Sequence, residues 1–153
     1  MTRDNSDMCV VVARAAITEA ADQRVWDLLG AGASGLAPLA EHVLAVAATP
    51  DGDQRWSVLL NGSKVDWVQR NRRTGERELA FEQVSGDLAE LCGRWTLEPG
   101  QLCVTIEFHL GVDGLAPLLD PIWTQSFQAH ADALVRAVAG AAGNDAEERE
   151  EQA

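Results

Sequence analysis

The sequence predicts an α+β domain in which one curved antiparallel sheet of six or seven strands wraps round a long C-terminal helix. Three observations predict it. Five or six apolar, strand-like runs follow one another between residues 42 and 110, with turn residues between them. Another apolar run lies at residues 8–17, and residues 118–142 repeat apolar side chains at helical spacing. The 153 residues are enough for one domain with one core.

The N-terminal part predicts one strand and two short helices. Residues 8–17 are β-branched and bounded by polar residues, which is typical of a buried strand. Thr18 can cap a helix over residues 20–29, which Gly30 ends. A second short helix is expected around residues 36–42.

The middle of the chain predicts an antiparallel meander. Tight turns are expected where Gly, Asn, Asp and Pro gather, for example at Asn61-Gly62. One antiparallel sheet must hide an apolar face, and only the helix at 118–142 is large enough to cover it. This architecture is called helix-grip. The expected strands are residues 42–49, 55–61, 64–72, 76–84, 88–97 and 102–110.

Composition limits the class of function. We expect residues 1–143 to form a single domain with an internal cavity, and the acidic residues 144–153 to be a disordered tail. A formal charge of −12 argues against nucleic acid and anionic membranes as partners. Three cysteines without a C-x-x-C pattern suggest neither disulfides nor a zinc site. No apolar stretch approaches the ~20 residues of a membrane span, so we expect a cytoplasmic protein.

Several segments resemble one superfamily. Ala21-Asp-Gln-Arg-Val-Trp-Asp-Leu28 resembles the opening segment of START-like (SRPBCC, helix-grip) proteins. Later strands resemble its polyketide aromatase/cyclase and coenzyme Q-binding branches, and the segments that carry this likeness are residues 60–67, 86–88, 93–96 and 106–108. The resemblance implies a ligand cavity between the sheet and the C-terminal helix, lined by aromatic residues.

The resemblance also maps two family positions onto this chain. In aromatase/cyclases a pocket Arg and a Tyr help to fold a reactive poly-β-ketone. The family's Trp falls on Trp67, and the same inward parity selects Gln69 and Asn71. The family's Arg then corresponds to Asn71, and its Tyr has no counterpart because the chain contains no Tyr. These departures argue against the usual aromatase mechanism.

His130 is the predicted catalytic residue. It shares a helix face with Trp123 and Phe127, and an imidazole can take and give a proton near neutral pH. The alternative is a hydrogen-bonded histidine at the edge of the core, and His42 is expected to be structural. The predicted substrate-binding residues are Trp67, Gln69, Asn71, Trp95, Ile106, Phe108, Trp123, Ser126 and Phe127.

Glu107 and His109 fall on the outer face of the last strand, where two ligands are too few for a metal site, so no metal or cofactor is expected. The favoured function is cyclisation or dehydration of a hydrophobic polyketide-type molecule by a monomer or homodimer. A carrier protein that tethers this substrate could dock on Arg70, Arg72 and Arg73. The alternatives are a lipid or quinone carrier and, third, a partner-binding regulator like the ribosome-associated toxin relatives of the quinone-binding branch.

Overall fold

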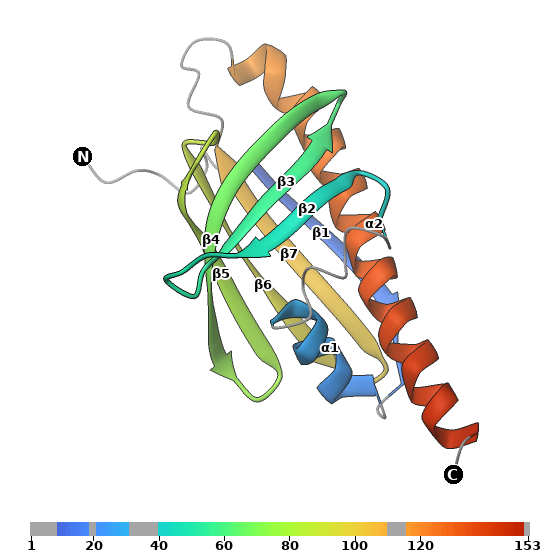
Figure 1. Cartoon of the computed structure of the whole chain (residues 1–153). Helices are drawn as coiled ribbons and strands as arrows, with labels where there is room; N and C mark the ends of the chain where they lie inside the picture. The colour runs from blue at the N-terminus through green and yellow to red at the C-terminus, as the bar shows by residue number, and fades with distance from the viewer. Residues whose placement is uncertain (1–8, 19–20, 31–39, 110–115, 152–153) are drawn as a thin grey trace.

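The computed structural model describes residues 9–18, 21–30, 40–109 and 116–151, and its elements follow the predicted order (Figure 1). One strand and one short helix precede six strands and a long helix. The elements are β1 (Cys9–Ala16), α1 (Asp22–Leu29), β2 (Val43–Ala48), β3 (Gln54–Leu60), β4 (Ser63–Gly75), β5 (Glu78–Gly86), β6 (Glu90–Glu98), β7 (Gln101–His109) and α2 (Ala116–Glu151).

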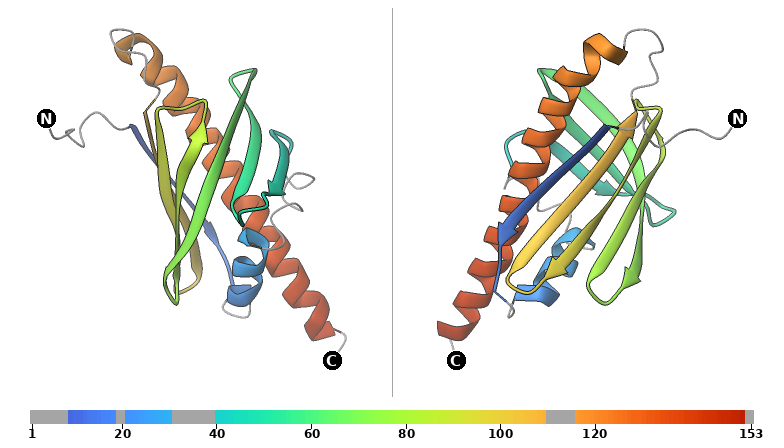
Figure 2. Two further views of the ribbon diagram at one scale, coloured as in Figure 1. Left: turned by 60° about the vertical axis from the view of Figure 1, so that its left-hand side comes forward. Right: turned by 180° about the vertical axis from the view of Figure 1, so that it is seen from behind.

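The seven strands form one antiparallel sheet in the order β1-β7-β6-β5-β4-β3-β2. Each strand from β2 to β6 pairs with the next one along the chain, and β1 pairs with β7. The sheet curves, and α2 crosses it on the concave side, in contact with β1, β7, β3 and α1 (Figures 1 and 2). The predicted helix-grip architecture is therefore confirmed, with seven strands.

The prediction of two short helices after the first strand is wrong for the described residues, where α1 is the one helix before β2. The expected second helix at 36–42 falls mostly on residues 31–39, which lie outside the described residues. Residues 40–42 form a turn, closed by a hydrogen bond from Val43 N–H to the Ala40 carbonyl at 2.9 Å. The His42 carbonyl already accepts from Leu59 N–H at 2.8 Å, so pairing with β3 replaces helical hydrogen bonding there.

The C-terminal helix is longer than expected. α2 continues to Glu151 and so includes most of the segment at 144–153 that was expected to be disordered. This segment is rich in Glu and also contains Ala, Arg and Gln, all of which favour helix, and it contains neither Pro nor a β-branched residue. It has no apolar side chain larger than alanine, so its small contribution to the stability of the domain stays a prediction.

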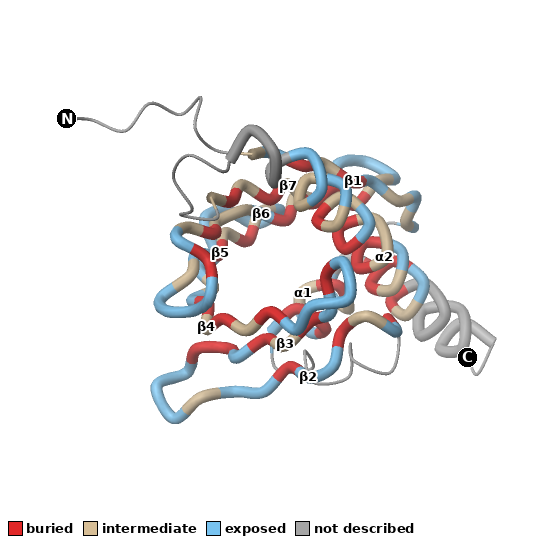
Figure 3. The backbone as a smooth tube through the Cα atoms, turned by 90° about the horizontal axis from the view of Figure 1, so that it is seen from above, coloured by how far each residue is buried: buried red, intermediate tan, exposed pale blue. Residues whose placement is uncertain are grey.

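The core lies between the sheet and α2, and strand parity decides which side chains enter it. Along β7, Leu102, Val104, Ile106 and Phe108 are at most 3% exposed, while the side chains between them face the other way. Along β4 the buried positions are Val65, Trp67 and Gln69, as predicted. Figure 3 shows these buried positions alternating along the strands and gathering on the side of α2 that faces the sheet. The helix contributes Phe127, Ala131, Leu134, Val135 and Val138.

Gly93 allows Phe81 to pack across the inner face of β6. A Cβ atom at residue 93 would lie 2.2 Å from the Thr105 carbonyl oxygen and 2.5 Å from Cζ of Phe81. Neither atom can move far, because one belongs to the backbone of β7 and the other to a buried ring. The absence of a side chain at this position is therefore part of the packing.

We expect Gly93→Ala to lower the free energy of unfolding by about 1–3 kcal/mol, the usual cost of overpacking. Gly140→Ala is the matched control, because its Cβ would meet no atom within 4 Å on a helix, where Ala is favoured over Gly. Urea unfolding followed by circular dichroism should show a lower midpoint for Gly93→Ala and an equal or higher one for Gly140→Ala. Equal midpoints for Gly93→Ala and the wild type would contradict this account.

Candidate functional site

An internal cavity lies between the sheet and α2. Its volume is about 20 Å³, room for about one water molecule. Aromatic rings from β3, β4, β5, β6 and α2 fill most of the space that the sheet encloses. The lining residues are Trp56, Trp67, Gln69, Phe81, Leu91, Trp95, Val104, Ile106, Phe127, His130 and Leu134.

Six of the ten predicted site residues meet at this cavity: Trp67, Gln69, Trp95, Ile106, Phe127 and His130. Phe108 is fully buried and stacks on Phe127 with ring centroids 4.1 Å apart, without bordering the cavity. Trp123 is half-buried and packs against the core. Asn71 and Ser126 are also half-buried, and each is hydrogen-bonded to a neighbour.

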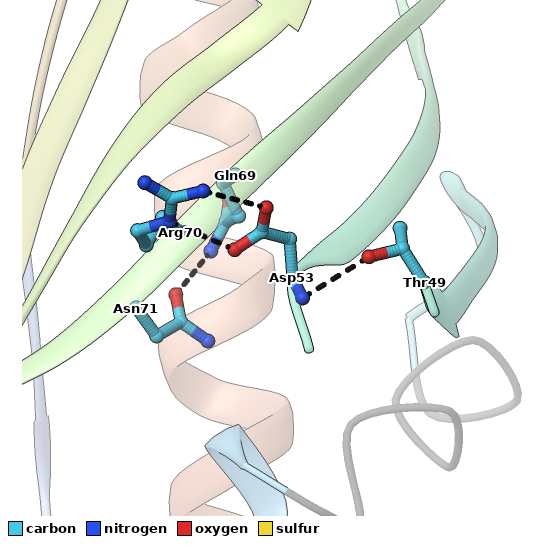
Figure 4. A network of polar contacts seen from close by, with 5 residues as sticks. All are labelled: Thr49, Asp53, Gln69, Arg70 and Asn71. Carbon is cyan, nitrogen blue, oxygen red and sulfur yellow. Dashed lines mark hydrogen bonds and ion pairs between the residues drawn. The ribbon is translucent and has the colours of Figure 1, made fainter. Parts of the chain in front are cut away.

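Two of the three indole N–H groups of the cavity wall, those of Trp56 and Trp67, have glutamine partners. Trp56 and Trp67 stack with an interplanar angle of 3° and centroids 6.1 Å apart. Trp67 Nε1 donates to Gln69 Oε1 at 2.8 Å, and Trp56 Nε1 donates to Gln54 Oε1 at 3.2 Å. Gln69 Nε2 donates in turn to Asn71 Oδ1 at 2.9 Å (Figure 4). Gln69 and Asn71 thus bond each other, and each could offer a ligand its remaining N–H groups and the second lone pair of its amide oxygen.

Arg70 lies on the opposite face of β4 from Gln69 and Asn71. Its guanidinium forms two hydrogen bonds to the buried Asp53 carboxylate, at 3.1 and 3.2 Å (Figure 4). Hydrogen bonding to Asp53 raises the pKa of Arg70. Arg73 instead stacks over Trp26 of α1, 4.5 Å from the ring centroid. Arg70 and Arg73, which were predicted as parts of one cluster with Arg72, therefore have separate partners.

His130 forms a hydrogen-bonded pair with His42. Nδ1 of His130 lies 2.5 Å from Nε2 of His42, and the two rings meet edge to face. His130 is 3% exposed and its ring also meets Trp67 and Phe127 edge to face. Burial lowers the pKa of His130 to about 3, with a smaller contribution from His42, and burial also lowers the pKa of His42. Both rings are therefore neutral at neutral pH, and one donates while the other accepts.

The sequence did not predict this pair. The two histidines are 88 residues apart and come from the turn before β2 and from α2. No short pattern joins such positions, and only the packing of α2 over the sheet brings them together. The low pKa of His130 also changes its chemistry, because an isolated ring with this pKa would be a weak base at neutral pH.

A larger groove runs along α2 beside the turn between β3 and β4. Its volume is about 590 Å³, and both histidines lie on it. Leu59 and Ile122, which are 40% and 45% exposed, give it apolar sides. The lining residues are Ala40, Glu41, His42, Leu59, Leu60, Asn61, Ile122, Gln125, Ser126, Ala129, His130 and Ala133. His130 thus borders both the groove and the internal cavity.

A third hollow, of about 390 Å³, lies on the outer face of the sheet and includes Glu107. Glu107 accepts a hydrogen bond from Cys92 Sγ at 3.5 Å. Burial, with a contribution from Glu107, raises the pKa of the Cys92 thiol to about 11, so this cysteine is protonated and a poor nucleophile. Among the described residues, no three His, Cys, Asp or Glu side chains are grouped to hold a metal ion.

Residues 18–139 match the family described as polyketide cyclase/dehydrase and lipid transport. The chain belongs to this family. The superfamily resemblance that the sequence segments carry is thereby confirmed. A search of curated proteins gives no significant match. No helix in the described part of the chain has the length and apolar character needed to cross a bilayer.

Solved structures of similar fold include an aromatase/cyclase. The Zhui aromatase/cyclase from Streptomyces sp. R1128 superposes with a TM-score of 0.73 and 21% identity, over 88% of this chain and 93% of that one. The protein TTHA0849 from Thermus thermophilus superposes with a TM-score of 0.72 and 19% identity, over 88% of this chain and 96% of that one. A START superfamily protein from Mycobacterium smegmatis superposes with a TM-score of 0.64 and 15% identity, over 86% of this chain and 96% of that one. At these identities the likeness shows the fold alone.

The lowered pKa of His130 predicts a pH-dependent stability. The unfolded chain protonates this histidine below about pH 6.5 and the folded chain only near pH 3, so the unfolded state binds more protons between these values. Stability should therefore fall as pH falls through this window, by up to about 1.4 kcal/mol per pH unit from this group. Urea unfolding from pH 7 to pH 4 should show a shallower slope for His130→Gln than for the wild type. His109→Gln, on the outer face of β7, is the control, and equal slopes for His130→Gln and the wild type would contradict the assignment.

Proposed function

We propose that this protein binds a hydrophobic, polyketide-type molecule at His130, where the internal cavity meets the groove along α2, and promotes its cyclisation or dehydration. The observation that carries the proposal is the neutral His42–His130 pair at the junction of the two spaces. The family match and the fold shared with an aromatase/cyclase support it.

The volumes favour the groove for most of the ligand. Small-molecule sites usually measure roughly 300–1,000 Å³. The groove, at about 590 Å³, lies in this range, whereas the cavity of about 20 Å³ does not. In this arrangement of side chains the bulk of a ligand lies against the apolar sides of the groove, and its reacting end reaches His130. Ser126, which also lies on the groove, donates its hydroxyl proton to the Ile122 carbonyl, so its oxygen could accept a hydrogen bond from a ligand hydroxyl.

The chemistry needs a base, an acid and a fixed geometry. His42 occupies Nδ1 of His130, so Nε2 is the ring nitrogen left to meet a ligand. A neutral Nε2 can abstract a proton from a carbon next to a carbonyl, and the His42–His130 pair can later supply a proton to a leaving hydroxyl, which departs as water. Holding the reacting atoms together can contribute roughly 7–11 kcal/mol, so little further machinery is required. This suits a site with Asn71 where the family has Arg, and with no Tyr in the chain.

The alternative is a carrier of lipids or quinones that binds without reaction. The apolar lining of the cavity favours it, because only Gln69 and His130 among the lining residues are polar apart from the indole N–H groups. A carrier and an enzyme would share the aromatic wall and differ at His130. The experiment that separates them must therefore measure binding and turnover independently.

We expect His130→Ala and His130→Gln to lower turnover by about 10²–10⁴-fold, the usual contribution of one acid–base group. The substrate is the benzaldehyde–acetone aldol, a β-hydroxyketone that loses water to give benzylideneacetone, and product is measured by chromatography. Binding of a hydroxyanthraquinone, measured by quenching of tryptophan fluorescence, should change far less in both variants. Trp67→Ala should instead weaken binding of the hydroxyanthraquinone more than it lowers turnover.

Each result has a distinct meaning. Unchanged turnover in His130→Ala would remove this residue from the mechanism. Loss of turnover in Trp67→Ala alone would indicate that the shape of the site drives the reaction. If the wild type binds the anthraquinone but converts no aldol, the carrier alternative is supported. Circular dichroism confirms that each variant is folded.

A further inference from the structure

We infer that His42 is a positioning residue which carries protons between His130 and the groove, so that the two histidines act as one relay. The inference rests on the proposed function and adds to it a residue, a path and a direction for the proton. No sequence pattern pointed to His42, which was expected to be structural.

The geometry forms a continuous path. His130 Nδ1 and His42 Nε2 face each other as a hydrogen-bonded pair, so a proton can pass directly from one ring to the other. Each ring then has one further nitrogen, Nε2 in His130 and Nδ1 in His42. His130 is almost fully buried against Trp67 and Phe127, whereas His42 is half-buried on the groove. The deeper ring therefore meets the reacting molecule, and the shallower ring exchanges protons with the groove.

Burial explains why one histidine would not suffice. The apolar surroundings of His130 disfavour an imidazolium, so a lone ring there could not hold a proton taken from a substrate. A second imidazole removes the difficulty, because a proton that enters at one end of the pair leaves at the other. Neither ring then carries a net charge in the initial or the final state.

The proton balance is complete. The pair exchanges between two tautomeric arrangements, and in the one that reacts His130 has a free Nε2 and donates its Nδ1–H to Nε2 of His42, which carries its other proton on Nδ1. Nε2 of His130 takes a proton from a carbon next to a carbonyl, and the C–H electron pair forms the enolate. The Nδ1–H proton passes to His42, and His42 releases its Nδ1–H proton to the groove. Both rings end neutral in the opposite tautomer, and the reverse transfer protonates a leaving hydroxyl, which departs as water.

Charged groups around the pair are few. Of the described residues that line the groove, Glu41 is the one with a formal charge, and it precedes His42 on the same turn. The groove residues that come from α2, from β3 and from the turn after β3 are uncharged. They are Ile122, Gln125, Ser126, Ala129, Ala133, Leu59, Leu60 and Asn61. Within the cavity, the lining residues other than His130 are also uncharged.

Nitrogen-15 NMR of the histidine rings tests the relay without any substrate. A shared proton predicts intermediate shifts for both facing nitrogens, His130 Nδ1 and His42 Nε2, at neutral pH. His42→Gln should move His130 Nδ1 out of this intermediate range, and His109→Gln should leave it unchanged. A single fixed tautomer in each ring, or a charged His42 at pH 7, would overturn the relay whatever the activity.

Kinetic measurements test whether the reaction uses the relay. With the benzaldehyde–acetone aldol, His42→Gln should lower kcat by about 10²-fold, at the lower end of one acid–base contribution, with little change in KM. Added imidazole should restore part of the activity of His42→Ala, whereas thiazole, which has no N–H to pass on, should not. Equal rescue by both, or an unchanged kcat in His42→Gln, would overturn the proposal. If the wild type converts no aldol, the proposed function fails on that substrate, and the NMR result alone decides the relay.

Discussion

The inner face of the sheet must be covered, and α2 is the element that covers it. Seven strands present a continuous apolar face, and α1 is too short to bury it. Every side chain on the inner side of α2 is therefore drawn into the core, including the polar His130 beside Phe127 and Leu134. A buried imidazole without a partner would cost about 1–3 kcal/mol. His42, presented by the turn before β2, supplies that partner, and burial keeps both rings neutral.

The same constraint explains the polar atoms of the cavity wall. Tryptophans that face the core bring N–H groups with them, and each N–H needs an acceptor. Gln54 accepts from Trp56 and donates to the Leu29 carbonyl at the end of α1, so one side chain joins the sheet to the helix. Gln69 accepts from Trp67 and donates to Asn71. These amides are thus needed for folding first, and any role toward a ligand falls on the N–H groups and oxygen lone pairs that remain.

Much of this arrangement could be predicted from local patterns, because period-two alternation fixes which side of a strand is buried. Trp67, Gln69 and Ile106 were assigned to the inner face on that basis, and they line the cavity. Helical spacing likewise placed His130 beside Phe127. The His42 contact could not be predicted in this way, because it depends on the curvature of the sheet and on the path of α2. Nor could the size of the cavity, since parity says which rings point inward but not how closely they pack.

The packing of those rings bears directly on the choice between enzyme and carrier. A carrier encloses its ligand, so it would have to separate Trp56 from Trp67, or Phe127 from Phe108, to enlarge a cavity of about 20 Å³. That change would expose close aromatic contacts, each of which contributes about 0.5–1.5 kcal/mol beyond the area it buries. A reaction at His130 requires no such change, because only the reacting atoms have to reach the ring, and the groove of about 590 Å³ already leads to it. A buried neutral pair beside that groove therefore favours proton transfer over storage.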